Sequence, residues 1–593
     1  MISTARRERL GKLLFALASV ISLASVISIF AFLIARGLPA ISRIGWDDFL
    51  LGRVWSPDRD DGYVGEVLGS YGILPMIAGT GAVTLGALLF GGIAGIFTAI
   101  FLVYFCPARH RKRFSSVIHL LAGIPSVVYG FFGIVLLLPT LAQIAPNNGS
   151  GLLAASLILG LMILPTVVSL SATALLAVPE SYRHASMALG ATRTETIFRV
   201  VLPAARSGIT ASLILGIGRA LGETMAVVMV AGNAPIFPRG FFRSFRVMTA
   251  NIVMEMGYAG DLQEGALVAT GVILLFFVLI VNLIFHALSH RAARRIGRPI
   301  RSKKRKLIPA SLAYAKGFPL LGRICATFFG VSTLLSLLLI LGFLWIKGLP
   351  PLLTNPELVV GRFEFGSHRV TLLPAVITTL MALLLSIGLA IPIGVMSAIF
   401  LHEYANPKHP AVRILRLSID ILSGVPSIVY GLFGMIAFLP IFGGTSSILA
   451  GSLTVSMMLL PTVVRATEES LSAVDDSLRA GSLALGAGKL RTVMRIVIPA
   501  AAPGILSAVI LSMGRVISES APFLYTTGSV ISSVPRSYLD SGATLAVSLY
   551  QLSGEGWYLE EAYAAAVVLI LIILLLNFLA EKLSARLLSR AQK

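Results

Sequence analysis

One stretch of sequence occurs once in each half of this chain. LAGIPSVVYGFFG begins at Leu121, and LSGVPSIVYGLFG begins at Leu422. Further repeated segments follow in the same order with small drift in spacing, which indicates duplication or fusion. Any fold for this chain must therefore contain two related halves. The other repeated segments are LPTVV at 164–168 and 460–464, and GRALGET at 218–224 matched by GRVISES at 514–520.

The composition indicates that both halves lie in a lipid membrane. Of 593 residues, 56% are hydrophobic and 13% are charged, and the mean hydropathy is +0.89. The apolar runs are long enough to cross a hydrocarbon layer of roughly 30 Å as helices, and helices satisfy their own backbone groups there. We predict spans at 13–35, 74–104, 115–139, 151–172, 207–232 and 264–288, and at 321–347, 370–401, 413–441, 446–466, 504–530 and 562–580.

Six spans in each half make both halves enter the membrane from the same side, which predicts a parallel repeat. The boundaries expected from this pattern are a first domain at 1–290, a basic linker at 291–318 and a second domain at 319–593. The first run follows three arginines, as in a signal peptide. It exceeds the usual apolar core of roughly 7 to 15 residues, so an uncleaved anchor is the better interpretation.

Basic loops set the expected orientation. The short loops rich in arginine and lysine, the linker included, predict that both termini are cytoplasmic. Arg239, Arg243 and Arg246 are an exception on the expected outer side. The net charge of +21 suits basic loops beside anionic lipid headgroups, and it gives little support to nucleic-acid binding.

The loop between the fourth and fifth spans of each half carries a second repeated pattern. In both copies a glycine is followed, after nine residues, by an aliphatic residue, a gap, an aliphatic residue and a proline. This pattern predicts a short amphipathic helix, a glycine turn and a second segment that ends at the proline. It resembles the coupling loop of ABC importer permeases, which docks on an ATPase, although His184 and Ala480 replace its usual glutamate. The alternative is an interfacial helix without a partner. The candidate coupling residues are Arg183, His184, Ala185, Gly190, Leu202 and Pro203, and Arg479, Ala480, Gly481, Gly486, Ile498 and Pro499.

Charged residues lie within the fifth span of each half. Arg219 and Glu223 are four residues apart, as are Arg515 and Glu519, so each pair can share one helix face and form an ion pair. Ionisable residues at such depth are functional candidates. Two arginines across a pseudo-two-fold axis would suit a tetrahedral oxyanion. The alternatives are that the pairs only lock helices together or reach back to the headgroups.

Proline–serine pairs in the third span of each half suggest breaks in those helices. Ser126, Tyr129, Ser427 and Tyr430 are candidates to line a path there, since proline frees a backbone carbonyl. The neighbouring glycines equally suit close helix packing.

Other chemistry finds little support in the residues. The nearest approach to an ATP-binding loop, GAGKL at 486–490, has the wrong glycine spacing and no hydroxyl residue. Cys106 and Cys325 have no metal-ligand spacing. A membrane-embedded enzyme would need a convergent cluster of histidine, aspartate or cysteine. We therefore expect a transport subunit without its own cofactor.

GIPSVVYGFFG with GRALGET, and GVPSIVYGLFG with GRVISES, resemble the two permease subunits of the bacterial phosphate-specific (Pst) ABC transporter, the PstC-like subunit first and the PstA-like subunit second. The resemblance covers nearly the whole chain and implies an all-α, type I importer fold in the cytoplasmic membrane. It implies phosphate as substrate and four charged pathway residues, Arg219, Glu223, Arg515 and Glu519. Ser518 and Ser520 depart from the usual pattern.

The same resemblance implies two protein partners. One is a cytoplasmic ATPase dimer (PstB-like) that holds ATP and magnesium, and the other is an extracytoplasmic binding protein (PstS-like). Sulfate, molybdate and tungstate remain alternatives because all are tetrahedral oxyanions. An ion-driven secondary transporter also uses six-plus-six repeats, but it would not need paired docking loops.

Overall fold

The structure is a computed structural model of the whole chain. It describes residues 4–57, 69–145, 148–294, 317–361, 370–422, 424–529, 531, 534–554 and 558–591. Most of the expected linker, residues 295–316, lies outside the described residues.

The first half is helical apart from one small hairpin, in which Trp55 pairs with Tyr71. Short π-helical turns interrupt several of its spans. Its elements are α1 (Thr4–Ile44), α2 (Trp46–Leu51), β1 (Trp55–Ser56), β2 (Ser70–Tyr71), α3 (Leu74–Ala87), η1 (Leu88–Gly92), α4 (Ile93–Ile100), η2 (Phe101–Phe105), α5 (Ala108–Ala122), α6 (Ser126–Phe132), η3 (Gly133–Leu137), α7 (Leu138–Ala142), α8 (Leu152–Leu176), α9 (Glu180–Ala188), α10 (Arg193–Thr196), η4 (Ile197–Val201), α11 (Leu202–Ala204), α12 (Arg206–Gly222), α13 (Met225–Val230), α14 (Met248–Glu255), η5 (Met256–Tyr258) and α15 (Asp261–Arg294).

The second half repeats this order, and in its described part no strand occurs. Its elements are α17 (Gly317–Thr354), α18 (Glu357–Val360), α19 (Leu373–Ile399), η6 (Phe400–Tyr404), α20 (Pro410–Leu422), α21 (Ser427–Phe438), η7 (Pro440–Phe442), α22 (Ile448–Ser472), α23 (Asp476–Ala484), α24 (Lys489–Thr492), η8 (Val493–Val497), α25 (Ile498–Ser518), α26 (Ala521–Thr526), α27 (Leu545–Gly554) and α28 (Leu559–Ala591).

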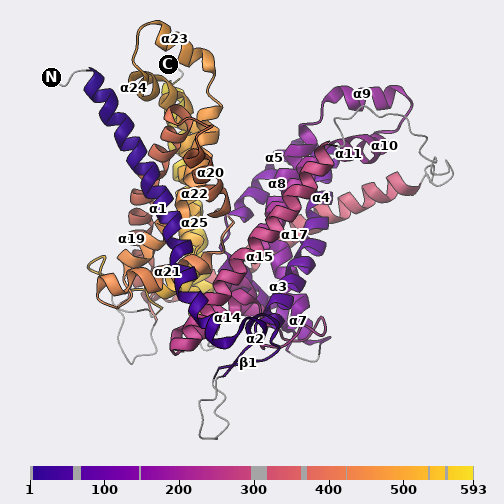
Figure 1. Cartoon of the computed structure of the whole chain (residues 1–593). Helices are drawn as coiled ribbons and strands as arrows, with labels where there is room; N and C mark the ends of the chain where they lie inside the picture. Colours follow the sequence, from indigo (N-terminus) through magenta and orange to yellow (C-terminus); the bar gives the residue numbers. More distant parts are fainter. Residues whose placement is uncertain are drawn as a thin grey trace, which may run out of the picture.

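The two halves form two groups of helices that meet at the end carrying α14 and diverge toward the end carrying α9 and α23 (Figure 1). Both chain ends lie at this diverging end (Figure 1). The halves are joined where they meet, because the Tyr525 hydroxyl donates to the carbonyls of Ile252 (3.1 Å) and Val253 (2.9 Å). A polar link therefore joins the halves at this end of the molecule.

The first helix of each half packs on the other half. Helix α1 contacts α19 as well as α15, and α17 contacts α4 as well as α28. In Figure 1 the indigo α1 runs along the orange second half. The Thr98 and Thr333 hydroxyls lie 3.0 Å apart in the α4–α17 contact, and the Phe97 and Phe329 rings stack at 5.5 Å. Each half thus includes a helix of the other in its packing.

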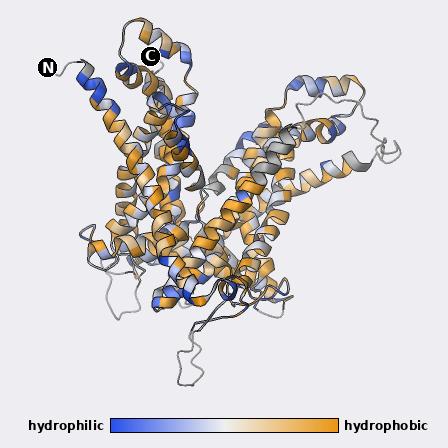
Figure 2. Ribbon diagram, in the orientation of Figure 1, coloured by the Kyte–Doolittle hydropathy of each residue, from blue (hydrophilic) through white to orange (hydrophobic). Residues whose placement is uncertain are grey.

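Apolar segments lie at all twelve expected spans, but not all of them are single membrane-crossing helices. Within the described residues, nine helices are long and apolar enough to span a membrane, or ten if a pair bent by 68°, Arg193–Ala204 with Arg206–Gly222, is one span. At the third expected span of each half the structure has a shorter apolar helix, Ser126–Ala142 and Ser427–Phe438. Figure 2 shows the apolar residues along these helices and the hydrophilic ones gathered toward both ends.

The third spans are broken at their proline–serine pairs, as expected, whereas the fifth spans were predicted as continuous, and this was wrong. The third spans break before Pro125 and Pro426, and the fifth break at Glu223 and Glu519. Proline disfavours helical φ/ψ in the residue before it, and each glutamate adopts extended backbone angles. The breaks therefore lie at the residues that sequence reasoning singled out for function.

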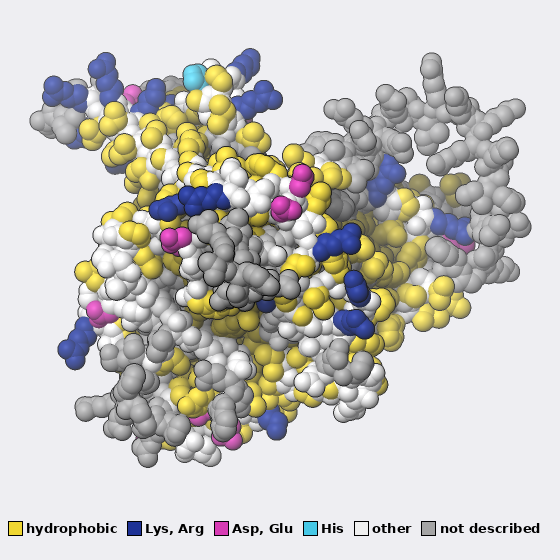
Figure 3. Space-filling view, turned by 60° about the horizontal axis from the view of Figure 1, so that its bottom comes forward, with side chains coloured by type: hydrophobic (Ala, Val, Ile, Leu, Met, Phe, Trp, Pro, Cys, Tyr) yellow, Lys and Arg dark blue, Asp and Glu magenta, His cyan; other side chains and the backbone are white. Residues whose placement is uncertain are grey.

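One of the three arginines in the unexpected basic loop at the meeting end, Arg246, is neutralised inside the protein, whereas Arg239 and Arg243 are exposed. Arg246 forms an ion pair with Glu255, and the two side chains are only 11% and 9% exposed. The Trp55 indole (2.6 Å) and the Gln263 amide (2.9 Å) donate to the same carboxylate. Arg246 therefore counts little toward orientation. Figure 3, turned toward this end, shows scattered single charges among hydrophobic side chains.

Candidate substrate passage and coupling segments

The fifth-span arginines lie on helices, and the glutamates lie at the breaks that follow. Helix α12 ends at Gly222, and Glu223 has φ −75° and ψ 134° before α13 begins; Glu519 has φ −78° and ψ 134° between α25 and α26. The residues of each pair were expected to share one helix face, and this is wrong because the glutamates have left the helix. The Arg515 Nε still lies 3.5 Å from Glu519 Oε1. Among the described residues, Arg219 and Glu223 form no such ion pair.

Each arginine has a threonine partner that sequence reasoning did not assign. Arg219 Nη1 donates to Thr166 Oγ1 at 3.2 Å, and Arg515 Nη1 donates to Thr462 Oγ1 at 3.1 Å. Both threonines belong to the repeated LPTVV segments. The sequence signal for these threonines is the repetition of LPTVV in both halves. The sequence alone does not show that this segment lies beside the arginine segment, because the two are on different helices.

The two kinds of break meet within each half. Ser126 is the first residue of α6, after Pro125, and it hydrogen-bonds with Glu223; Ser427 is the first residue of α21 and hydrogen-bonds with Glu519. The Ala226 N–H also donates to Glu223 at 3.4 Å. The glutamates thus lie against the N-terminal ends of short helices, where backbone donors favour negative charge.

Tyr129 and Tyr430 are placed differently from the serines. Their side chains are 0% and 1% exposed, and the Tyr430 hydroxyl donates to the Leu422 carbonyl at 3.0 Å. In this structure Tyr430 ties the start of α21 to the end of α20 and does not line an open path. The half-buried serines, by contrast, hydrogen-bond with the glutamates.

The charged groups of the two halves approach one another. A side chain at Gly222 would begin 3.5 Å from the Cα of Pro426, so the break in one half contacts the break in the other. Glu223 and Glu519 repel each other electrostatically, while Arg219 of the first half attracts Glu519 of the second. Four half-buried charges, two of each sign, therefore converge between the halves.

Their depth argues against contact with the headgroups at the diverging end. Thirteen residues separate Arg206 at the start of α12 from Arg219, which corresponds to about 20 Å along the helix axis. A guanidinium cannot reach back over that distance. The alternative role of locking helices stays open for both arginines, because each donates to a threonine of another helix.

The coupling loops form the expected helix and glycine turn. Helices α9 and α23 are followed by Gly190 (φ 85°) and Gly486 (φ 81°), whose left-handed backbone favours glycine. In each half one hydroxyl pair holds the two arms of the loop together. The pairs are Ser186 with Thr196 at 2.9 Å and Ser482 with Thr492 at 2.8 Å.

The second arm does not end at its proline. Pro499 lies inside a helix that runs from Lys489 to Ser518, so the expected stop is wrong there; in the first half the bend comes at Ala205, after Pro203. A π-helical turn precedes both prolines, η4 before Leu202 and η8 before Ile498. Such turns relax the normal i to i−4 hydrogen bonding, which lets the helix continue past a residue without an N–H.

The outer face of each coupling helix is exposed. Leu189 and Leu485 are 89% and 90% exposed, and Ala185, Ala480 and Gly481 are also exposed. Exposed leucines on a polar segment are typical of an interaction surface. His184 points outward and lies 3.9 Å from Glu180.

The two coupling arginines differ. Arg479 is 14% exposed and donates to Glu403, Asp476 and two backbone carbonyls, whereas among the described residues Arg183 donates to the exposed Glu180 alone. Arg479 therefore holds α23 in place and is not free to replace the missing motif glutamate in contacting a partner.

Comparison with known proteins assigns this architecture to a family. The model of one family, described as the inner membrane component of binding-protein-dependent transport systems, matches residues 91–294 and 390–591. The chain belongs to this family. The two matches coincide with the two structural repeats, so this permease carries two family domains in one polypeptide.

Named relatives agree with the duplication. A Mycoplasma pneumoniae protein named phosphate transport system permease protein PstA homolog is 30% identical, covering 84% of this chain and 85% of its own length. The PstC permease protein of Mesorhizobium japonicum is 34% identical over 45% of this chain and 84% of its own length. The PstA 1 protein of Mycobacterium tuberculosis is 32% identical over 43% and 86%. PstC proteins match the first half and PstA proteins the second.

Proposed function

We propose that this permease moves inorganic phosphate into the cell as the membrane part of an ABC importer. The observation that carries the proposal is the convergence of Arg219 and Arg515 with two glutamates at the helix breaks. Relatives over both halves carry the name of phosphate transport systems. The chemistry of the site and the names of its relatives point to the same substrate class.

The passage would work by charge balance. Guanidinium groups present several donors in a plane and suit the oxygens of a tetrahedral oxyanion. Glu223 and Glu519 would neutralise the arginines when the site is empty and limit the affinity when it is filled. Ser126 and Ser427 would hold the glutamates in position. The backbone breaks would supply polar groups where a continuous helix has none.

Coupling would occur through α9 and α23. One subunit of a cytoplasmic ATPase dimer would dock at α9 beside Leu189, and the other at α23 beside Leu485. ATP and magnesium would be bound by the ATPase. This assignment places the diverging end of the two halves and both termini in the cytoplasm. A PstS-like binding protein would then deliver phosphate at the opposite end, beside α14. The permease itself would carry out no hydrolysis.

The test is uptake of radiolabelled phosphate into proteoliposomes that hold this chain with its ATPase and binding protein. We expect uptake that requires ATP and resists excess sulfate and molybdate. Uptake without ATP would indicate a secondary carrier. ATP-dependent uptake suppressed by either competitor would keep the architecture and overturn the substrate, since the site chemistry also suits other tetrahedral oxyanions.

A further inference from the structure

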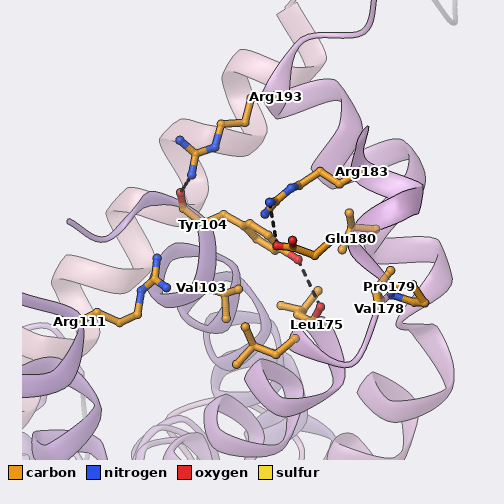
Figure 4. A pocket seen from close by; sticks show the side chains of 11 residues that line it. Val103, Tyr104, Arg111, Leu175, Val178, Pro179, Glu180, Arg183 and Arg193 are labelled. Carbon is orange, nitrogen blue, oxygen red and sulfur yellow. Dashed lines mark hydrogen bonds and ion pairs between the residues drawn. The ribbon is translucent and has the colours of Figure 1, made fainter. Parts of the chain in front are cut away.

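A basic pocket lies at the base of the first coupling helix. Its volume is about 190 Å³, and its lining includes three arginines from three elements: Arg111 of α5, Arg183 of α9 and Arg193 of α10. Figure 4 shows them around the side chain of Tyr104. Glu180 is the only acidic residue in the lining. We call this the three-arginine pocket.

The arginines of this pocket are incompletely paired. Arg183 Nη2 donates to Glu180 at 2.9 Å, but that carboxylate is 74% exposed. Arg193 Nη2 donates to the Tyr104 carbonyl at 2.9 Å. Arg111 has no hydrogen bond or ion pair within the described part of the chain. Three positive charges therefore face one solvated negative charge.

The second half provides an internal comparison. FLVYF at 101–105 corresponds to FLHEY at 400–404, so Glu403 occupies the position of Tyr104. Glu403 lies 3.0 Å from Arg479, the counterpart of Arg183. The other counterparts are Asp476 for Glu180, Lys489 for Arg193 and Val412 for Arg111.

Among arginines, lysines and carboxylates, the second half therefore balances two basic residues with two acidic ones; its Glu403 is 9% exposed and also lies 3.2 Å from the His402 ring. The first half has one more base and one fewer acid at the same place. Its Tyr104 turns its hydroxyl to the Leu175 carbonyl at 3.2 Å instead of presenting a carboxylate. The position that an internal anion fills in one copy lacks that anion in the other.

We propose that the three-arginine pocket binds a phosphate group. The group would come from an anionic phospholipid at the membrane face or from free inorganic phosphate in the cytosol. Guanidinium forks match phosphate oxygens in geometry and charge. The pocket volume of about 190 Å³ leaves room for a phosphate group.

The bound group would bridge three elements. Because Arg111 precedes the third span while Arg183 and Arg193 lie on either side of the glycine turn, one anion would fix α9 against the membrane end of the first half. The second coupling segment is already fixed by Glu403. Occupancy would thus stiffen the first coupling segment alone, which gives one half of the transporter a ligand-dependent contact surface.

The test uses the full chain with the passage silenced by Arg219→Gln and Arg515→Gln, so that its outcome does not depend on transport. One arm measures binding of radiolabelled inorganic phosphate in nanodiscs of phosphatidylcholine. The other counts phosphatidylglycerol molecules retained in native mass spectrometry. Tyr104→Glu places a carboxylate in the pocket, as Glu403 does in the second half. Arg111→Gln removes an exposed arginine without disturbing the fold. Arg113→Gln, on the same helix, is the matched control.

We expect the parent chain and Arg113→Gln to bind one phosphate group that Tyr104→Glu and Arg111→Gln bind at least tenfold more weakly. A difference in the first arm identifies inorganic phosphate, and a difference in the second identifies lipid. Equal binding by all four chains, or no binding by the parent in either arm, would overturn the proposal. Cross-linking of Arg111→Cys to an acidic segment of the ATPase, with no binding of either probe, would instead assign the pocket to the docking interface.

Discussion

The unequal pairing of the two coupling arginines leads to a quantitative prediction. Arg479 makes two ion pairs, at 3.0 Å each, and two bonds to backbone carbonyls, at 2.7 Å each, with 14% of its side chain exposed. Removing one partner of a buried ion pair costs roughly 3 to 5 kcal/mol. Because Arg479 keeps some solvent contact and Asp476 is exposed, we take about 3 kcal/mol as the cost of Arg479→Met.

The matched change in the first half should cost much less. Arg183 is 33% exposed and its partner Glu180 is 74% exposed, and exposed ion pairs contribute roughly 0 to 1 kcal/mol. A difference of about 2.5 kcal/mol corresponds to roughly a 70-fold difference in the equilibrium for local opening. Methionine keeps the aliphatic stem in both variants, so the comparison isolates the guanidinium.

Amide hydrogen exchange in nanodiscs can measure this opening directly. In Arg479→Met we expect the amides of α23 to exchange roughly 160-fold faster than in the parent chain, as 3 kcal/mol implies. In Arg183→Met the amides of α9 should accelerate by less than about fivefold. The reasoning fails if both variants accelerate their own helices equally, or if α23 in Arg479→Met keeps the parent rate.

Three further changes test the packing. Glu255→Gln removes the charge from a buried network, so we expect a loss of about 3 kcal/mol and a lower unfolding midpoint in detergent; an unchanged midpoint would contradict the assignment. Gly91→Ala places a methyl group 2.2 Å from a backbone oxygen of the facing helix and should cost roughly 1 to 3 kcal/mol, whereas Gly81→Ala meets nothing within 4 Å and should be tolerated; equal midpoints would count against this contact. Thr98→Cys with Thr333→Cys, in a background without the native cysteines, should form a disulfide that keeps the halves together on a gel after cleavage at a protease site inserted in the linker. Two separate bands after oxidation would disprove the crossing of α17 onto the first half.

The architecture was largely readable from the sequence because it depends on sums over many residues. Apolar length gave the number of spans, and repeated segments such as 218–224 and 514–520 gave the duplication. The family matches at 91–294 and 390–591 confirm the duplication. The crossing of α1 and α17 could not be predicted in this way, since their lipid-like sequences do not specify which neighbour they pack against.

The residues of the candidate site could be predicted from the sequence, but their arrangement in space could not. Charges at depth identified Arg219, Glu223, Arg515 and Glu519, whose roles stay a prediction. Their helical spacing suggested an ion pair in each half, but the backbone breaks at both glutamates, and among the described residues only the second half forms the pair. Helix periodicity cannot reveal a break that tertiary contacts stabilise.

The sequence does contain the difference that makes the two coupling segments unequal, but nothing in the sequence marks it as important. The tyrosine at 104 and the glutamate at 403 differ at one aligned position, and no propensity or motif draws attention to that difference. Its meaning depends on which arginine lies beside it, which only the folded arrangement supplies. The same holds for the buried Arg246, whose loop position suggested an exposed charge.

The central claim is that the charges at the helix breaks carry the anion. The most direct measurement is the initial rate of ATP-dependent phosphate uptake by Arg219→Gln and Arg515→Gln, with co-purification of the ATPase measured in parallel. Loss of a charge-assisted bond to the passing anion, worth about 2 to 3 kcal/mol, predicts a fall of roughly 100-fold in each variant while the ATPase stays bound. Lys347→Gln, a charge change on a spanning helix outside the site, should keep the parent rate. Parent-like uptake in both arginine variants would contradict the claim.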